Sequence, residues 1–283
     1  EPPATDELSL AEYRHIARRL EPAELTAEEP PADWSITEED LMGALQHTSR
    51  ASRFLGYYSR HGLEVAFERY GVMERLRGLG FRRLRVETDL EDAVGHTLRI
   101  VSGDFPAEPL IELRVGRDTA SIPGMELLRV EWLQLRNPKG SFSENRPRLP
   151  GQKNPGLGLL RHIVGMLVMT CERLGLEGVF FTPSHYHLAV QSRKVLRFLE
   201  PVDEARFRAI VRALEDLPLA EATAALEQGR LRDEENGETV RYTPAPMVLP
   251  VGRRLKERVG RPAYEDAVAR NAVRFRFRRV DAS

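Results

Sequence analysis

Four short segments that alternate apolar and polar residues follow one another along the middle of the chain, and they constrain its fold most. They lie at 82–87, 97–101, 110–115 and 127–135, and turn residues separate them, among them Gly95, Gly103, Pro106, Gly116 and Gly124. Alternation with a period of two is typical of half-buried β-strands, and links this short join neighbouring antiparallel strands. The sequence therefore predicts a four-stranded antiparallel meander.

Segments with helical periodicity flank the meander. We expect a helix at 8–20, where Ser9 and Glu12 have the spacing of a capping box, and further helices at 37–58 and 63–79. Residues 21–31 are rich in Pro, Glu and Ala, which is typical of a linker. Downstream, the pattern predicts helices at 159–174, 188–199, 204–217, 220–228 and 264–271, and strands at 178–182, 238–242, 247–251 and 273–280.

The order of these elements predicts the fold class. Strand 127–135, helix 159–174 and strand 178–182 form a strand–helix–strand unit, which requires a parallel or nearly parallel pair. The chain is then an α+β protein with a mixed, mostly antiparallel sheet flanked by helices and with an N-terminal helical extension. We expect an acidic extension and linker at 1–42, a main domain at 43–252, and a basic helix and strand at 253–283 packed on it.

Composition and charge narrow the class of protein. The chain has 283 residues and a net charge of −1, which gives no support to nucleic-acid binding. No apolar run reaches the roughly 20 residues that span a bilayer, so we expect a cytoplasmic protein without a membrane partner. Residues 1–42 carry twelve acidic and three basic residues, whereas 253–283 carry ten basic and four acidic ones. These ends are either solvated surfaces or a docking surface for a charged partner.

A glycine turn precedes the helix at 159–174. It reads Lys153-Asn154-Pro155-Gly156-Leu157-Gly158. Glycines let the backbone approach a phosphate closely, and a helix N-terminus offers free N–H groups and about half a positive charge. A dinucleotide-binding turn needs Gly or Ala three residues after Gly158, where this chain has Arg161. A phosphate-binding turn and a plain connector remain as alternatives.

The element order and this turn together resemble the GNAT (acyl-CoA N-acyltransferase) superfamily over about residues 63–251. The segment Glu131-Trp132-Leu133-Gln134-Leu135 is similar to the fourth strand of that family. Lys153 to Gly158 is similar to its pyrophosphate loop, Arg/Gln-x-x-Gly-x-Gly/Ala. The family's later Asn-x-x-Ala-x-x-x-Tyr-x-x-x-Gly-Phe segment aligns with 186–198, where Ala189 and Phe198 match.

The resemblance implies an enzyme that binds acetyl-CoA or another acyl-CoA as co-substrate and passes the acyl group directly to an amine on a small molecule or a protein. Glu131 is the candidate base, Tyr186 and Tyr242 are the candidate acids, and His185 could take either role. The resemblance also leaves a homodimer open. The residues expected to bind the acyl-CoA are Leu133, Gln134, Leu135, Lys153, Asn154, Gly156, Leu157 and Gly158.

Two departures from the family pattern leave other hypotheses open. Arg193 stands where the family's Tyr protonates the departing thiolate, and residues 137–152 lengthen the connection before the loop. The second hypothesis is therefore a catalytically inactive GNAT-like scaffold that acts as a binding or regulatory module. The third is an unrelated α+β protein whose charged termini mediate assembly.

The remaining chemistry-bearing residues favour structural roles. His185 and His187 would point the same way on an extended segment, but no third ligand stands at a suitable spacing, so we expect no metal. Ser141 and Ser143 lack the pattern of a serine nucleophile. The single cysteine, Cys171, excludes an internal disulfide and is expected to be a packed core thiol. At the C-terminus, Val273, Phe275 and Phe277 alternate with arginines, which favours an edge strand with its apolar side inward over stacking on nucleic-acid bases.

Overall fold

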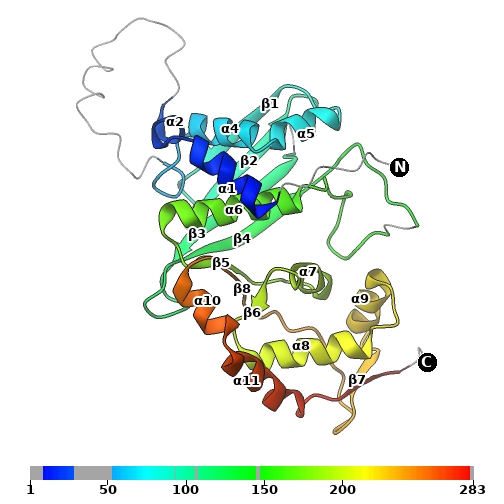
Figure 1. Ribbon diagram of the computed structural model, residues 1–283. Helices are drawn as coiled ribbons and strands as arrows, with labels where there is room; N and C mark the ends of the chain where they lie inside the picture. Colours follow the sequence, from blue (N-terminus) through cyan, green and yellow to red (C-terminus); the bar gives the residue numbers. More distant parts are fainter. Residues whose placement is uncertain (1–8, 29–52, 93, 106–107, 145–146, 281–283) are drawn as a thin grey trace, which may run out of the picture. The chain divides into compact units, whose positions relative to one another are not determined.

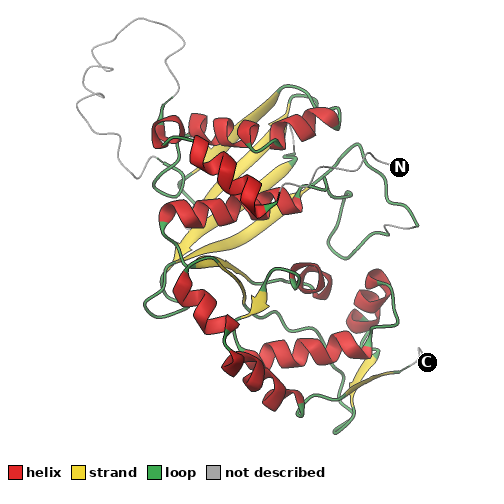
Figure 2. Cartoon of the chain, viewed as in Figure 1, coloured by secondary structure: helices red, strands yellow, loops and turns green. Residues whose placement is uncertain are grey.

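The computed structural model describes residues 9–28, 53–92, 94–105, 108–144 and 147–280 (Figures 1 and 2). The chain divides into two compact units, which we call unit 1 and unit 2. Unit 1 comprises Glu1–Arg117, Val130–Pro138 and Gly156–Arg173, and unit 2 comprises Asp118–Arg129, Lys139–Pro155 and Leu174–Ser283. Most of the helix expected at 37–58 lies outside the described residues, and residues 53–59 form turns and a single bridge between Phe54 and Tyr58.

The fold is α+β, as the sequence predicts, and is built on a mixed, mostly antiparallel sheet of seven strands in the order β1-β2-β3-β4-β5-β8-β6. A second sheet pairs β7 with β9. The strands are β1 (Leu84–Asp89), β2 (His96–Ser102), β3 (Ile111–Asp118), β4 (Leu127–Leu135), β5 (Gly178–Phe181), β6 (Arg197–Phe198), β7 (Leu231–Asp233), β8 (Met247–Pro250) and β9 (Phe277–Arg279).

The predicted meander is present, and β1, β2, β3 and β4 are consecutive neighbours in the sheet. Strands β1 and β2 pair antiparallel with Val86 opposite Ile100, and β2 pairs antiparallel with β3, with Leu98 opposite Leu113. These four side chains are all buried. Strand β4 follows β3 in the sheet and has the bounds that the alternation predicts.

The N-terminal helices of unit 1 follow the sequence in part. Helix α1 (Leu10–Arg19) begins with the expected capping box, in which Ser9 and Glu12 exchange backbone and side-chain hydrogen bonds. The linker prediction for 21–31 is wrong at its start, because Glu21 and Glu24 form a second capping arrangement and Pro22 begins helix α2 (Pro22–Thr26). Proline is favoured in a first helical turn, where its missing N–H costs nothing.

The helix expected at 63–79 is two helices. Helix α4 (Arg60–Arg69) and helix α5 (Val72–Gly78) meet at Gly71, whose φ of +74° ends the helical ladder. Gly80, with a φ of +86°, stands after α5, as expected of a stop. Helix α6 (Leu160–Leu174) runs over the same face of the strands as α4 (Figure 1).

Unit 2 departs more from the sequence expectations. Helix α7 (Tyr186–Ser192) is shorter than the helix expected at 188–199, because residues 197–198 instead form β6, in which Phe198 pairs with Met247 of β8. Pro201 begins helix α8 (Pro201–Ala213), three residues before the start of the helix expected at 204–217. Helix α9 (Leu219–Glu227) confirms the short helix expected at 220–228.

The C-terminal part of unit 2 contains two helices, α10 (Arg253–Gly260), which the sequence did not predict, and α11 (Pro262–Ala272), which it did. The strand expected at 238–242 is wrong, since only Thr239 bridges Arg232 there. The terminal strand is short: β9 holds Phe277, whereas Val273 is 73% exposed and does not point inward. Phe275 and Phe277 pack on two separate apolar clusters of the unit.

Within the described residues, none of the helices is both long and apolar enough to span a membrane.

Candidate functional site

The glycine turn before α6 is held by its leucines and exposed at its glycines. Leu157 and Leu159 are buried at 7% and 1% exposure, whereas Gly156 and Gly158 are exposed. Gly158 has a φ of +73°, a conformation that favours glycine. A Cβ placed on Gly156 would lie 3.8 Å from the carbonyl oxygen of Leu135, so the turn passes close to the end of β4 within unit 1.

The segment inserted before this turn closes on itself. The Arg148 guanidinium donates through Nε to the carbonyl oxygen of Gln152 at 2.6 Å. The Leu149 N–H donates to Oε1 of Gln152 at 3.2 Å, and the Gln152 N–H donates to the Leu149 carbonyl at 3.1 Å. Lys153 follows directly and is exposed, and Asn154 is half-buried. A backbone turn thus delivers a solvent-exposed ammonium group three residues before Gly156.

The expected acyl-binding strand is the second half of β4. Leu127, Leu128 and Val130 are buried, but Leu133, Gln134 and Leu135 are half-buried and Trp132 is 51% exposed. Glu131 is half-buried as well. The strand therefore leaves the core at Glu131 and gains solvent access along the four residues that follow.

The buried Arg136 anchors the end of β4. Its N–H donates to the Leu110 carbonyl at 2.8 Å, and its guanidinium donates to the Pro109 carbonyl at 3.0 Å and pairs with Glu108. These bonds fix the C-terminal end of β4 against the residues that lead into β3. The accessible stretch from Glu131 to Leu135 therefore has a fixed backbone.

The two candidate histidines of unit 2 meet at the start of α7. His185 is the N-cap and His187 lies in the first turn, so they are not on an extended segment as the sequence suggested, yet their rings stack at 5.4 Å. Nδ1 of His185 lies 3.6 Å from a carboxylate oxygen of Glu227 in α9. In the described part of the chain, no group of three side chains is arranged to hold a metal ion.

His187 is buried and, in the part of the chain that the structure describes, lacks a partner for one of its ring nitrogens. It is 2% exposed, and its Nδ1 meets no hydrogen-bond partner among the described residues. Burial, with a smaller contribution from the charge of His185, lowers the pKa of His187 to about 4. His187 is therefore neutral at physiological pH, and its imidazole can accept a proton only at a high cost.

The candidate acid Tyr186 lies inside the core of unit 2. It is 5% exposed, and its ring lies 6.0 Å from Phe207 and 6.3 Å from Tyr242. Burial raises the pKa of Tyr186 to about 12, against the opposing charge of Arg193. The phenol stays protonated at neutral pH, but its ring is a packing element of this core.

The division into units separates the predicted site residues into two sets. Unit 1 brings Glu131, the stretch Leu133 to Leu135 and the glycines of the turn together, and unit 2 holds His185 and Tyr186. Lys153 and Asn154 belong to unit 2 and join Gly156 through Pro155. Sequence reasoning missed Glu227, because nothing in the sequence links it to a histidine more than 40 residues earlier.

The comparisons with protein families and with curated proteins found no relative: neither a family model nor a curated protein matches the chain. The element order and the local geometry of the glycine turn thus carry the functional argument.

Proposed function

We propose that the protein is an acyl-CoA-dependent N-acyltransferase. The observation that carries this proposal is the exposed Gly156-Leu157-Gly158 turn, placed between the accessible end of β4 and the first residue of α6. Leu157 and Leu159 are buried in the core, so they hold the exposed backbone of Gly156 and Gly158 in place. A preorganised backbone of this kind suits a diphosphate, whose oxygens need several N–H donors at once.

The charge around the turn supports the same ligand. Lys153 supplies an ammonium group, and the N-terminus of the 15-residue helix α6 adds a partial positive charge. The half-buried residues Leu133 to Leu135 carry the backbone N–H and C=O groups that the amides of a pantetheine arm would bind. Acetyl-CoA or a longer acyl-CoA carries a diphosphate for the positive charge near the turn and amides for the backbone of Leu133 to Leu135.

The reaction needs one base and one acid. Glu131 accepts a proton from the ammonium form of the acceptor, the free amine attacks the thioester carbonyl, and the C–S bond breaks with release of the CoA thiolate. The released thiolate then takes up a proton, which balances the step. The acyl group moves directly to nitrogen, so no covalent enzyme intermediate forms.

An inactive scaffold that binds acyl-CoA without transferring the acyl group is the second candidate. The burial of Tyr186 favours it, because a phenol enclosed by Phe207 and Tyr242 has no free path to a substrate. Arg193, at the position of the family's acid, cannot serve as one because a guanidinium stays protonated.

Calorimetric titration with acetyl-CoA, and with longer acyl-CoAs, tests the binding step. We expect saturable binding to the full chain that Gly158→Val weakens by at least tenfold, because valine at a φ of +73° distorts the turn. Gly78→Ala in α5 is the control outside the turn: nothing lies within 4 Å of its Cβ position, and binding stays within about threefold of the wild type. No binding of any acyl-CoA at millimolar concentration would overturn the proposal.

Turnover separates the two candidates. Release of free thiol is followed over a panel of small-molecule and peptide amines. An enzyme gives amine-dependent thiol release that Glu131→Gln reduces by about 100-fold with little change in acyl-CoA affinity. Acyl-CoA binding without thiol release on the whole panel favours the scaffold.

A further inference from the structure

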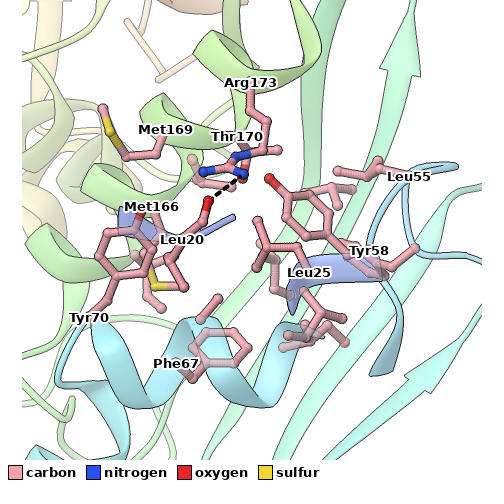
Figure 3. Close-up of a pocket in the computed structure, with 18 residues that line it drawn as sticks. Leu20, Leu25, Leu55, Tyr58, Phe67, Tyr70, Met166, Met169, Thr170 and Arg173 are labelled. Carbon is pink, nitrogen blue, oxygen red and sulfur yellow. Dashed lines mark hydrogen bonds between the residues drawn. The ribbon is translucent and has the colours of Figure 1, made fainter. Parts of the chain in front are cut away.

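A small apolar cavity lies inside unit 1, away from the glycine turn. Its volume is about 60 Å³, and it lies between α4, α6, the residues around α2 and the strands β2 and β3 (Figure 3). The side chains of Leu63, Phe67, Leu98, Leu113 and Met169 are among those that line it. Apolar cavities of this kind stay dry and take apolar guests.

One end of the cavity is polar. Tyr58, Thr170 and Arg173 gather there, and Figure 3 shows the phenol oxygen of Tyr58 pointing toward Arg173. A side-chain hydrogen bond joins Tyr58 and Thr170. Arg173 donates through its two terminal nitrogens to the carbonyls of Leu20, at 3.2 Å, and Ala17, at 2.8 Å.

The guanidinium of Arg173 has no counter-charge among the residues that the structure describes. Both of its hydrogen bonds go to neutral backbone carbonyls, and it forms no ion pair there. Burial raises the pKa of Tyr58 and of Tyr70, so the neighbouring phenols are neutral as well. A half-buried cation with donors to spare favours an anion, and a carboxylate matches its planar geometry best.

We propose that this cavity binds a short aliphatic carboxylate, with the chain among the leucines and the carboxylate on Arg173. The volume limits the chain, since a cavity of about 150 Å³ is what admits the six carbons of benzene. Met166 and Met169 line the wall, and their flexible thioethers allow it to widen along an unbranched chain. A carboxylate of about three carbons, such as propanoate, is the ligand we expect.

This site is distinct from the proposed acyl-CoA site. Arg173 lies thirteen residues after Leu160 on α6, and a helix rises 1.5 Å per residue, so about 20 Å of helix separates the two ends. The carboxylate site therefore goes beyond the proposed function, and either can hold without the other.

Calorimetric titration of the full chain with sodium propanoate tests the proposal, with propan-1-ol as the neutral probe of equal chain length. We expect saturable propanoate binding with a Kd of about 1 mM, and propan-1-ol at least tenfold weaker. No propanoate binding, or equal affinities for the acid and the alcohol, would overturn it.

Two variants locate the bound molecule. Ala66→Leu places a larger side chain in the cavity wall and abolishes propanoate binding, whereas Ala11→Leu on the exposed face of α1 leaves it unchanged. Arg173→Gln removes the charge but keeps an N–H donor, and it makes the affinities for propanoate and propan-1-ol equal. Propanoate binding retained in folded Ala66→Leu contradicts the proposal, and this result is informative even if Arg173→Gln fails to fold.

The acyl-CoA proposal is checked separately. Gly158→Val is expected to bind propanoate as the wild type does, because its substitution lies at the other end of α6. Loss of acetyl-CoA binding with propanoate binding retained, or the reverse, therefore identifies which of the two proposals fails.

Discussion

The ring of Tyr13 in α1 occupies the space that a side chain at Gly165 in α6 would fill. A Cβ on Gly165 would lie 2.7 Å from that ring, closer than real Cβ contacts come. Tyr13 is 4% exposed, stacks on Tyr70 at 5.6 Å and meets His162 edge-on at 6.4 Å. A glycine on α6 thus lets α1 pack directly on α6 within unit 1.

Substitution of this glycine is expected to destabilise the protein. Gly165→Ala forces Tyr13 out of its place and lowers the free energy of unfolding by about 1–3 kcal/mol, as overpacking of a core does. Gly78→Ala in α5 is the matched control: nothing lies within 4 Å of its Cβ position, and alanine there raises the free energy of unfolding by about 0.5–1 kcal/mol. Urea denaturation followed by circular dichroism measures both, and equal stabilisation by the two alanines would contradict the packing described.

Asp118 at the end of β3 is expected to contribute stability that acid removes. Burial disfavours its charge, but hydrogen bonds from Ser121 and Ala120 and the charge of Arg129 outweigh burial and hold the pKa of Asp118 below its usual value. Because the folded-state pKa is lowered, this stability is present above about pH 4 and disappears as the pH falls through the folded pKa.

Asp118→Asn tests this contribution. At pH 7 we expect it to lower the free energy of unfolding by about 1–2 kcal/mol, since a charged acceptor of three hydrogen bonds is lost. The difference from the wild type shrinks below about pH 3. A difference that stays constant from pH 7 to pH 3 would count against an ionised Asp118.

His187 is expected to make the protein sensitive to milder acid. Its pKa of about 4 in the folded state, set by burial and by His185, lies below that of an unfolded histidine. The neutral form is thus favoured by folding, and stability present above about pH 6.5 is lost as the pH falls toward 4, by at most about 3 kcal/mol.

His187→Gln removes that titration and is expected to flatten the loss of stability between pH 6.5 and 4.5 in urea denaturation. His15→Gln, on the exposed side of α1, is the control and keeps the wild-type profile. If the free energy of unfolding of His187→Gln depends on pH as that of the wild type does, other groups cause the acid sensitivity.

Cys171 is expected to be inert in the folded protein. It is fully buried, which confirms the core thiol predicted from its place in the sequence, and burial raises its pKa to about 12. A thiol reagent should label it at least 100-fold more slowly in buffer than in denaturant, because only the thiolate reacts. Cys171→Ser is expected to cost about 1–3 kcal/mol, since it buries a hydroxyl in an apolar site, and Cys171→Ala less. Fast labelling of the native protein is the contrary outcome.

Local signals in the sequence predicted those elements whose cause is local. The capping box of Ser9 and Glu12, the alternation of 127–135 and the glycine after α5 each act within a few residues, and the structure has all three. The helix at 188–199 failed because Phe198 gains more by pairing with Met247, almost fifty residues later, than by extending α7. No local pattern reports such a partner.

The candidate site divides in the same way. The glycine turn could be recognised from its residues alone, and its glycines are exposed because Leu157 and Leu159 point into the core. The contact between His185 and Glu227, the enclosure of Tyr186 and the hydrogen bonds from Arg173 to the Ala17 and Leu20 carbonyls depend on segments distant in the chain. These contacts could be found only from the tertiary structure.

By itself, the sequence determined the α+β class, the central meander, the bounds of β4 and the position of the glycine turn, because hydrophobic period, capping and glycine placement act at short range. The tertiary structure alone decided which side chains share an environment. Packing of distant segments stacked His185 on His187, placed Tyr13 against Gly165 and left Arg173 at the end of an apolar cavity. Burial and charge depend on all neighbours at once, and those neighbours are set only when the chain folds.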